Sequence, residues 1–110
     1  MDKITLYEFE SHDIKISIKV YFNEKNDLIF DGYEIGKRVN ELIGDSDYEY
    51  KYTIKDNDVK KIAKLFNIDF NEKIFLLKEI KNRFNENDAY SKFGNFMKEN
   101  NIEFESFTWR

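Results

Sequence analysis

A strict alternation of apolar and polar side chains in residues 14–22 is the feature that most constrains the fold of this chain. Apolar residues fill every second position: Ile14, Ile16, Ile18, Val20 and Phe22. Lysine, serine and tyrosine fill the positions between them. Because successive side chains of an extended strand point to opposite faces, this pattern predicts a β-strand whose apolar face packs inward.

The neighbouring segments predict two further strands. Residues 3–9 alternate in the same way, and an apolar run at residues 28–30 leads to Asp31-Gly32, a pair typical of turns. The polar connections between the three segments are short, as hairpin loops are. The beginning of the chain is therefore expected to form an antiparallel meander.

Two interpretations fit the segment between this meander and residue 47. Val39, Leu42 and Ile43 are spaced for a short helix closed by Gly44, whereas Gly36 is placed to end an extension of the preceding strand. We expect the short helix.

Residues 47–54 alternate again and predict a fourth strand. Its three tyrosines share one face with Ile54, and its two acids share the other with Lys51 and Thr53. After residue 54 the apolar spacing changes to that of helices. Three helices are expected, with their apolar positions in residues 59–66, 74–84 and 90–97.

Polar residues mark the expected ends of these helices. Asp56 or Asn57 is the expected N-cap of the first helix and Asn71 that of the second, because short polar side chains accept hydrogen bonds from free backbone N–H groups. Asn100-Asn101 is the expected stop of the third. Gly94 lies inside that helix, where glycine is expected to reduce helix stability by roughly 1 kcal/mol relative to alanine.

Residues 102–109 alternate once more and predict a closing strand. Residues 1–110 are therefore expected to form a single α+β domain, in which a mostly antiparallel sheet of four to five strands carries about three helices on one face. A length of 110 residues and a hydrophobic content of 41% are sufficient for one such core.

Acidic charge is concentrated in the first half of the chain. Residues 1–58 carry 14 acidic and 8 basic side chains, whereas residues 59–110 carry 8 and 10. Phosphate binding needs a basic surface, so direct nucleic-acid contact by the first half is not expected. No run of 18 apolar residues occurs and Met1-Asp2-Lys3 does not begin a signal peptide, so we expect a cytoplasmic protein without membrane contact.

The motifs predict no catalytic residue, metal site or cofactor. His12, the one histidine, lies in a predicted hairpin turn, where we expect it to be exposed. The serines lack a GxSxG context, and the four glycines are too far apart for the phosphate-binding patterns GxGxxG and GxxxxGKS/T. Without cysteine the chain has neither a disulfide nor a thiolate zinc site.

Residues 44–54, GDSDYEYKYTI, combine carboxylates with tyrosines and form the candidate functional segment. The three carboxylates offer three oxygen ligands, but calcium takes six to eight. An EF-hand loop that began at Asp45 would need glycine at its sixth position and glutamate at its twelfth. The chain has Tyr50 and Asp56 at these positions, so it does not match the EF-hand pattern. A solvated strand face and an acidic docking patch remain. The tyrosines likewise fit either a half-buried strand face or a protein contact.

In its size, its acidity and the GDSDYEY segment before a helical half, the chain resembles the small acidic immunity proteins that bacteria pair with toxins. The resemblance implies a non-catalytic module that neutralises a toxin or nuclease by binding its basic surface, with acids that steer the encounter and tyrosines that anchor it. The candidate partner-binding residues are Asp45, Asp47, Tyr48, Glu49, Tyr50, Asp56 and Asp58.

Three other functions stay open. Small phage inhibitors of bacterial defence nucleases share the acidic character. A self-associating structural subunit would use the Phe- and Tyr-rich faces or the edge of the closing strand. An enzyme would use a pair among the 22 carboxylates.

Overall fold

The structure is a computed structural model that describes residues 3–36 and 47–109. The described elements are β1 (Ile4–Glu10), β2 (Lys15–Phe22), β3 (Leu28–Ile35), β4 (Asp47–Ile54), α2 (Asp56–Leu65), α3 (Lys73–Arg83), α4 (Ala89–Glu99) and β5 (Glu105–Trp109). They form a five-stranded antiparallel sheet plus three helices, which confirms the predicted α+β class.

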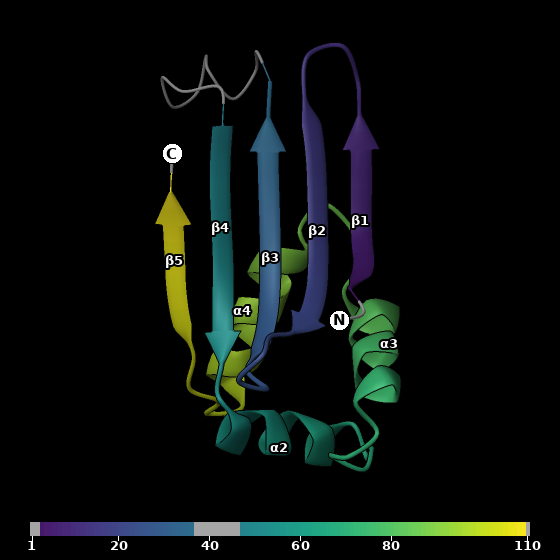
Figure 1. The fold of residues 1–110 in the computed structure, drawn as a ribbon, viewed down its shortest axis with the longest axis vertical. Helices are drawn as coiled ribbons and strands as arrows, with labels where there is room; N and C mark the ends of the chain where they lie inside the picture. Colours follow the sequence, from purple (N-terminus) through teal and green to yellow (C-terminus); the bar gives the residue numbers. More distant parts are fainter. Residues whose placement is uncertain (1–2, 37–46, 110) are drawn as a thin grey trace.

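The strands follow one another across the sheet in chain order, β1-β2-β3-β4-β5, and each pairs antiparallel with the next (Figure 1). β1 and β5 are the two edges, so the tyrosine-rich strand β4 is an interior strand. The register pairs β5 with Glu49 to Thr53 of β4, which leaves the first residues of β4 without a β5 partner.

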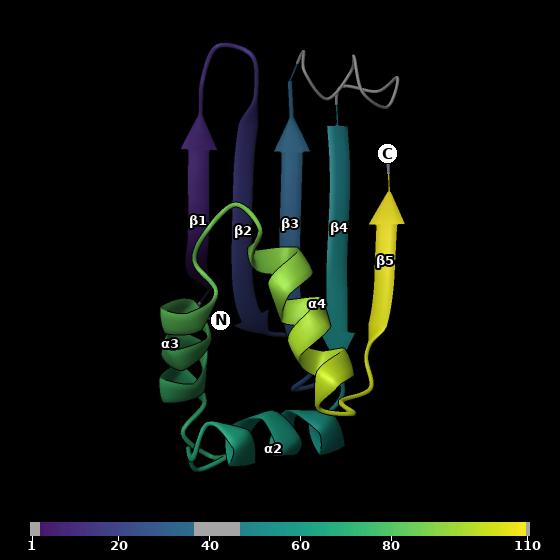
Figure 2. The same cartoon turned by 180° about the vertical axis from the view of Figure 1, so that it is seen from behind.

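The helices gather on one side of the sheet. Figure 2 shows α4 crossing that face, with α3 standing beside β1 and α2 running beneath the ends of the strands. The core lies between this face and the helices; at its centre the ring of Phe30 on β3 stacks on Phe93 of α4, with centroids 4.5 Å apart. No described helix is long and apolar enough to cross a bilayer.

The third strand is longer than predicted. Asp31-Gly32 does not form a turn, and β3 continues to Ile35. Gly32 lies in mid-strand opposite Tyr50, and a Cβ at this position would overlap the Tyr50 ring. This glycine therefore makes room for an aromatic side chain, and the prediction of a turn was wrong. Gly36, with φ of 139°, follows the last strand residue, so the alternative of a strand extension up to Gly36 is confirmed.

Some predictions fall on the part of the chain that is not described. The short helix predicted from Val39, Leu42 and Ile43 lies outside the described residues, as does Asp45.

The predicted helix caps need correction. Lys55 occupies the N-cap of α2 and Glu72 that of α3, and neither side chain caps its helix. Asp56 instead lies in the first turn of α2, together with Asp58, where negative charge favours the positive end of the helix dipole. The predicted stop of the third helix is confirmed, since Asn100 is the C-cap of α4 and Asn101 has φ of 56°.

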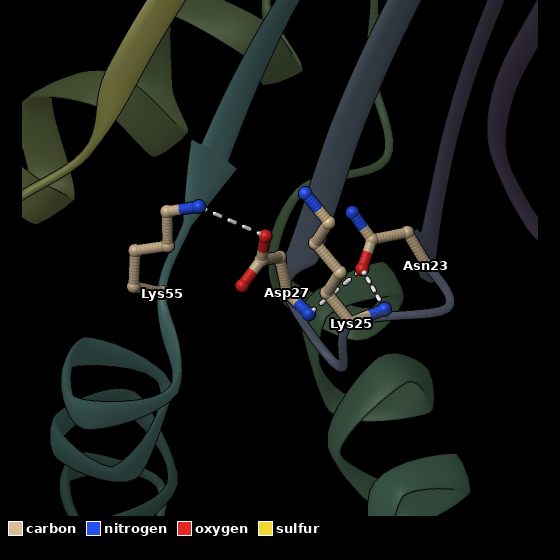
Figure 3. A network of polar contacts seen from close by, with 4 residues as sticks. All are labelled: Asn23, Lys25, Asp27 and Lys55. Atoms are coloured by element: carbon tan, nitrogen blue, oxygen red, sulfur yellow. Dashed lines mark hydrogen bonds and ion pairs between the residues drawn. The ribbon is translucent and has the colours of Figure 1, made fainter.

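A polar network closes the β2–β3 turn and ties it to the end of β4 (Figure 3). The Asn23 side-chain oxygen accepts hydrogen bonds from the backbone N–H groups of Lys25 and Asp27, at 2.9 and 3.0 Å. Buried Asp27 in turn pairs with Lys55, with Nζ and Oδ2 3.1 Å apart. This network fixes the strand ends and thereby the register of the sheet.

Candidate functional site

The sheet face opposite the helices is the candidate site, and we call it the open face. Strand alternation assigns side chains to it: Ile18, Val20, Phe30 and Tyr52 point into the core, so the residues next to them point outward. Two rows of paired residues run across the centre of this face. One row is Ser17, Tyr33, Glu49 and Trp109, and the other is Lys19, Asp31, Lys51 and Phe107.

In the first row, Glu49 of β4 stands between Tyr33 of β3 and Trp109 of β5. Tyr33 is 36% exposed and Trp109 is 54% exposed. Among the described residues, neither ring stacks on another aromatic ring or lies under a cation, and Glu49 forms no ion pair. Within the described part of the chain, the row therefore presents two aromatic rings and a carboxylate that have no such partners.

In the second row, Lys51 lies between Asp31 and Phe107. Its Nζ is 5.5 Å from the centroid of the Phe107 ring, which is 47% exposed. One carboxylate oxygen of Asp31, Oδ1, is buried and has no hydrogen-bond partner within the described part of the chain. Burial and the neighbouring Glu49 raise the pKa of Asp31, against the opposing effect of Lys51 and two further lysines.

A shallow hollow of about 470 Å³ adjoins these rows over β1, β2 and β3. Its lining consists of Lys3, Glu8, Lys15, Ser17, Lys19, Asp31, Tyr33 and Ile35. The Ser17 hydroxyl is buried here and, like Asp31 Oδ1, lacks a hydrogen-bond partner in the described structure. The lining holds three lysines and two acids, so the hollow carries little net charge.

Negative charge is concentrated at the aromatic end of the open face. Over β3, β4 and β5 the outward-facing charged residues are Asp31, Asp47, Glu49, Lys51 and Glu105, four acids against one base. Exposed aromatic rings beside several carboxylates suit the binding of a positively charged protein surface.

The structure divides the predicted site residues of β4 between two faces. Asp47 and Glu49 point to the open face, whereas Tyr48 and Tyr50 point to the helix side. Tyr50 is only 6% exposed. Its hydroxyl donates a hydrogen bond to Glu34 Oε1 at 3.4 Å, and its ring packs edge-to-face with that of Tyr90, with the ring centroids 4.5 Å apart. Burial, with the nearby Glu34 carboxylate, raises the pKa of Tyr50 far above its ordinary value. Tyr50 is thus a core residue with little surface to offer a partner.

Asp56 and Asp58 lie at the other end of the strand and have partners of their own. Asp56 pairs with Lys60 at 3.6 Å. Asp58 accepts a hydrogen bond from the backbone N–H of Glu103 at 3.0 Å and pairs with Lys61 at 3.2 Å. Seven residues of extended chain separate Glu49 from Asp56, or roughly 23 Å. The fold therefore does not bring these two acids onto the surface that Asp47 and Glu49 form.

Three residues of the open face were missed by sequence reasoning: Tyr33, Phe107 and Trp109. For Phe107 and Trp109 the sequence did hold a signal, because they alternate with the small polar residues Ser106 and Thr108. In the sheet, Ser106 and Thr108 pair with Tyr52 and Tyr50 and lie on the helix side. Which of the two faces would stay bare depends on how β5 pairs with β4, and no local pattern encodes that pairing.

His12 is exposed in the β1–β2 turn, as predicted, and lies 3.1 Å from Asp13. Within residues 3–36 and 47–109, no group of three or more histidines or acids is arranged to hold a metal ion.

No protein-family model, curated protein or solved structure matches this chain.

Proposed function

We propose that the protein is a non-catalytic binding module that inhibits a protein with a basic surface, of the toxin or nuclease class, by covering it with the open face. The observation that carries this proposal is the exposure of Tyr33, Phe107 and Trp109 on the sheet face that none of the described helices covers, beside a Glu49 that has no ion pair among the described residues. Tyrosine and tryptophan are the residues that most often dominate binding energy at protein interfaces.

The dimensions of the open face support this role. Five strands about 4.8 Å apart, with up to eight residues of about 3.3 Å each, span roughly 24 by 26 Å. A standard interface buries about 800 Å² on each partner. The area of the open face, with its side chains included, approaches this value. A paired sheet also loses little conformational freedom on binding, because its backbone is already ordered.

The charge of the open face supports a basic partner. Four acids and one lysine surround the aromatic rings over β3, β4 and β5. A basic partner is attracted to such a surface from a distance, and its cations find carboxylates at the edge of the aromatic contact. Toxins that act on nucleic acids carry basic surfaces of this kind, since they must bind phosphates.

The proposal is tested by comparing two aromatic substitutions of similar exposure. Trp109→Ser removes a ring from the open face, and Phe75→Ser removes a 59% exposed ring from α3. Wild type and both variants are used to capture proteins from the cells that produce the chain, and each captured protein is then purified for a binary affinity and activity measurement. We expect a basic protein whose activity is inhibited by wild type and Phe75→Ser, with at least tenfold weaker binding to Trp109→Ser. Equal binding to all three proteins would overturn the proposal.

A second candidate function, self-association, is favoured by the edge position of β5. All five of its residues are exposed, and an unpaired strand edge is a template for another strand. Sedimentation velocity at micromolar concentration tests this candidate. A dimer that a proline at Ser106 or Thr108 dissociates would support it, and a monomer at all concentrations would remove it.

A further inference from the structure

We propose that Tyr33, Glu49 and Trp109 form a slot that receives an arginine side chain of the partner. This inference rests on the proposed function, because it identifies the group that the open face recognises.

The register of the sheet gives the slot its width. Tyr33 pairs with Glu49, and Glu49 pairs with Trp109, so the three residues lie in one line across β3, β4 and β5. Adjacent strands are about 4.8 Å apart, which places the two aromatic residues roughly 10 Å from each other with the carboxylate between them. A cation above Glu49 is then about 5 Å from each ring, within the roughly 6 Å over which cation–π attraction acts.

The neighbouring row contains a cation beside an aromatic ring of the same chain. There Lys51, at the position next to Glu49 on the same face of β4, extends over the Phe107 ring at 5.5 Å and lies opposite Asp31. In the Tyr33–Glu49–Trp109 row the middle position carries a carboxylate instead, and no described lysine or arginine reaches its rings. Among the described residues, one row thus contains a lysine beside an aromatic ring, whereas the other has two rings and a carboxylate without a cation.

The charge of Glu49 acts on two neighbouring ionisable groups of the open face. Burial raises the pKa of Asp31 and that of Tyr21 on the same face, and the negative charge of Glu49 adds to both increases. No ion pair of Glu49 occurs among the residues that the structure describes.

Arginine suits this slot better than lysine. Its guanidinium group is planar, donates two parallel hydrogen bonds to one carboxylate and stacks on aromatic faces. A lysine ammonium is more strongly hydrated and meets a carboxylate as a point charge. A slot with two rings and one carboxylate therefore discriminates between two cations of equal charge.

Trp109 is the single tryptophan of the chain, so its fluorescence reports directly on the slot. The probes are hexa-arginine and hexa-lysine peptides, which carry the same number of charges. We expect hexa-arginine to change the Trp109 emission with a dissociation constant at least fivefold below that of hexa-lysine. Glu49→Gln should remove that difference, whereas Glu99→Gln, the same change at an exposed residue at the end of α4, should preserve it. Circular dichroism verifies that both variants remain folded.

The slot and the proposed function are contradicted by different results. Equal dissociation constants for the two peptides, or a preference for arginine that survives Glu49→Gln, would overturn the slot. The proposed function fails separately, if the captured partner binds wild type and Trp109→Ser equally. A partner that loses affinity with Trp109→Ser and keeps it with Glu49→Gln would leave the open face as the binding surface and remove the slot.

Discussion

The hydroxyl of Tyr52 on β4 lies directly against Gly94 of α4, where a Cβ on residue 94 would overlap it. The Tyr52 ring is held there by Tyr90, on which it stacks at 3.9 Å, and by the edge of Phe104 at 4.8 Å. Gly94 is therefore the point at which α4 approaches the sheet closely enough to cover β4.

Gly94→Ala is expected to destabilise the protein, although alanine is the better helix former. Helix propensity favours the substitution by about 1 kcal/mol, but overpacking of a fixed aromatic side chain costs about 1–3 kcal/mol. We expect the free energy of unfolding, measured in urea, to fall by about 1 kcal/mol. Adding Tyr52→Phe removes the overlapping oxygen but keeps the ring carbon beside it, 2.9 Å from the added Cβ, so it should recover part of this loss in a double-mutant cycle. A stabilised Gly94→Ala protein would show that Tyr52 does not hold this position.

Asp31→Asn is expected to stabilise the protein at neutral pH. Because burial and Glu49 raise the pKa of Asp31, the folded protein binds its proton more tightly than the unfolded chain does. This contribution to stability is complete below the unfolded pKa of about 4 and is lost as the pH rises through the folded pKa. At pH 7 the substitution should raise the free energy of unfolding by less than about 1 kcal/mol, since solvent screens the half-exposed group.

Urea unfolding of Asp31→Asn at pH 7 and at pH 3.5 measures this effect. The gain over wild type should be present at pH 7 and disappear at pH 3.5, and Glu24→Gln, in the exposed β2–β3 turn, should change neither value. A gain that is equal at both pH values would mean that the charge of Asp31 is not its cause.

Asp58→Ala is expected to reduce stability without affecting partner binding. The substitution removes the acceptor for the Glu103 N–H at 3.0 Å and the partner of Lys61. Loss of a hydrogen bond to a charged group costs about 1.5–3 kcal/mol. Asp56→Ala, which removes a solvent-exposed ion pair and one charge at the start of the helix, should cost about 1 kcal/mol or less. Weaker partner binding by a folded Asp58→Ala protein would place the interface on α2 and contradict the open-face account.

Much of the fold could be predicted from local patterns, because alternation and helical spacing are local properties. The strand at residues 47–54 is observed with the predicted bounds, and its acids and tyrosines do point to opposite faces. The turn predicted at Gly32 failed because the reason for this glycine lies in Tyr50, on the adjacent strand. A close packing contact between distant residues leaves no trace in the sequence around either of them.

The candidate site could be predicted only in part. Glu49 was identified from its segment, and the tyrosines beside it drew attention because tyrosine is common at interfaces. Tyr50, however, is covered by Tyr90 of α4, and the aromatic neighbours of Glu49 on the open face come from β3 and β5. Only the strand order and register reveal that Tyr33 and Trp109 flank this carboxylate.

Charge reversal at Glu49 tests the central claim most directly. The dissociation constant of the captured basic partner is measured for wild type, Glu49→Lys and Glu99→Lys at several salt concentrations. Glu99 is exposed at the end of α4, on the helix side of the sheet, so its reversal changes the net charge equally without touching the open face. We expect Glu49→Lys to weaken binding at least tenfold and to reduce its salt dependence, and Glu99→Lys to change affinity less than twofold. Equal effects of the two reversals, or none from Glu49→Lys, would contradict the account.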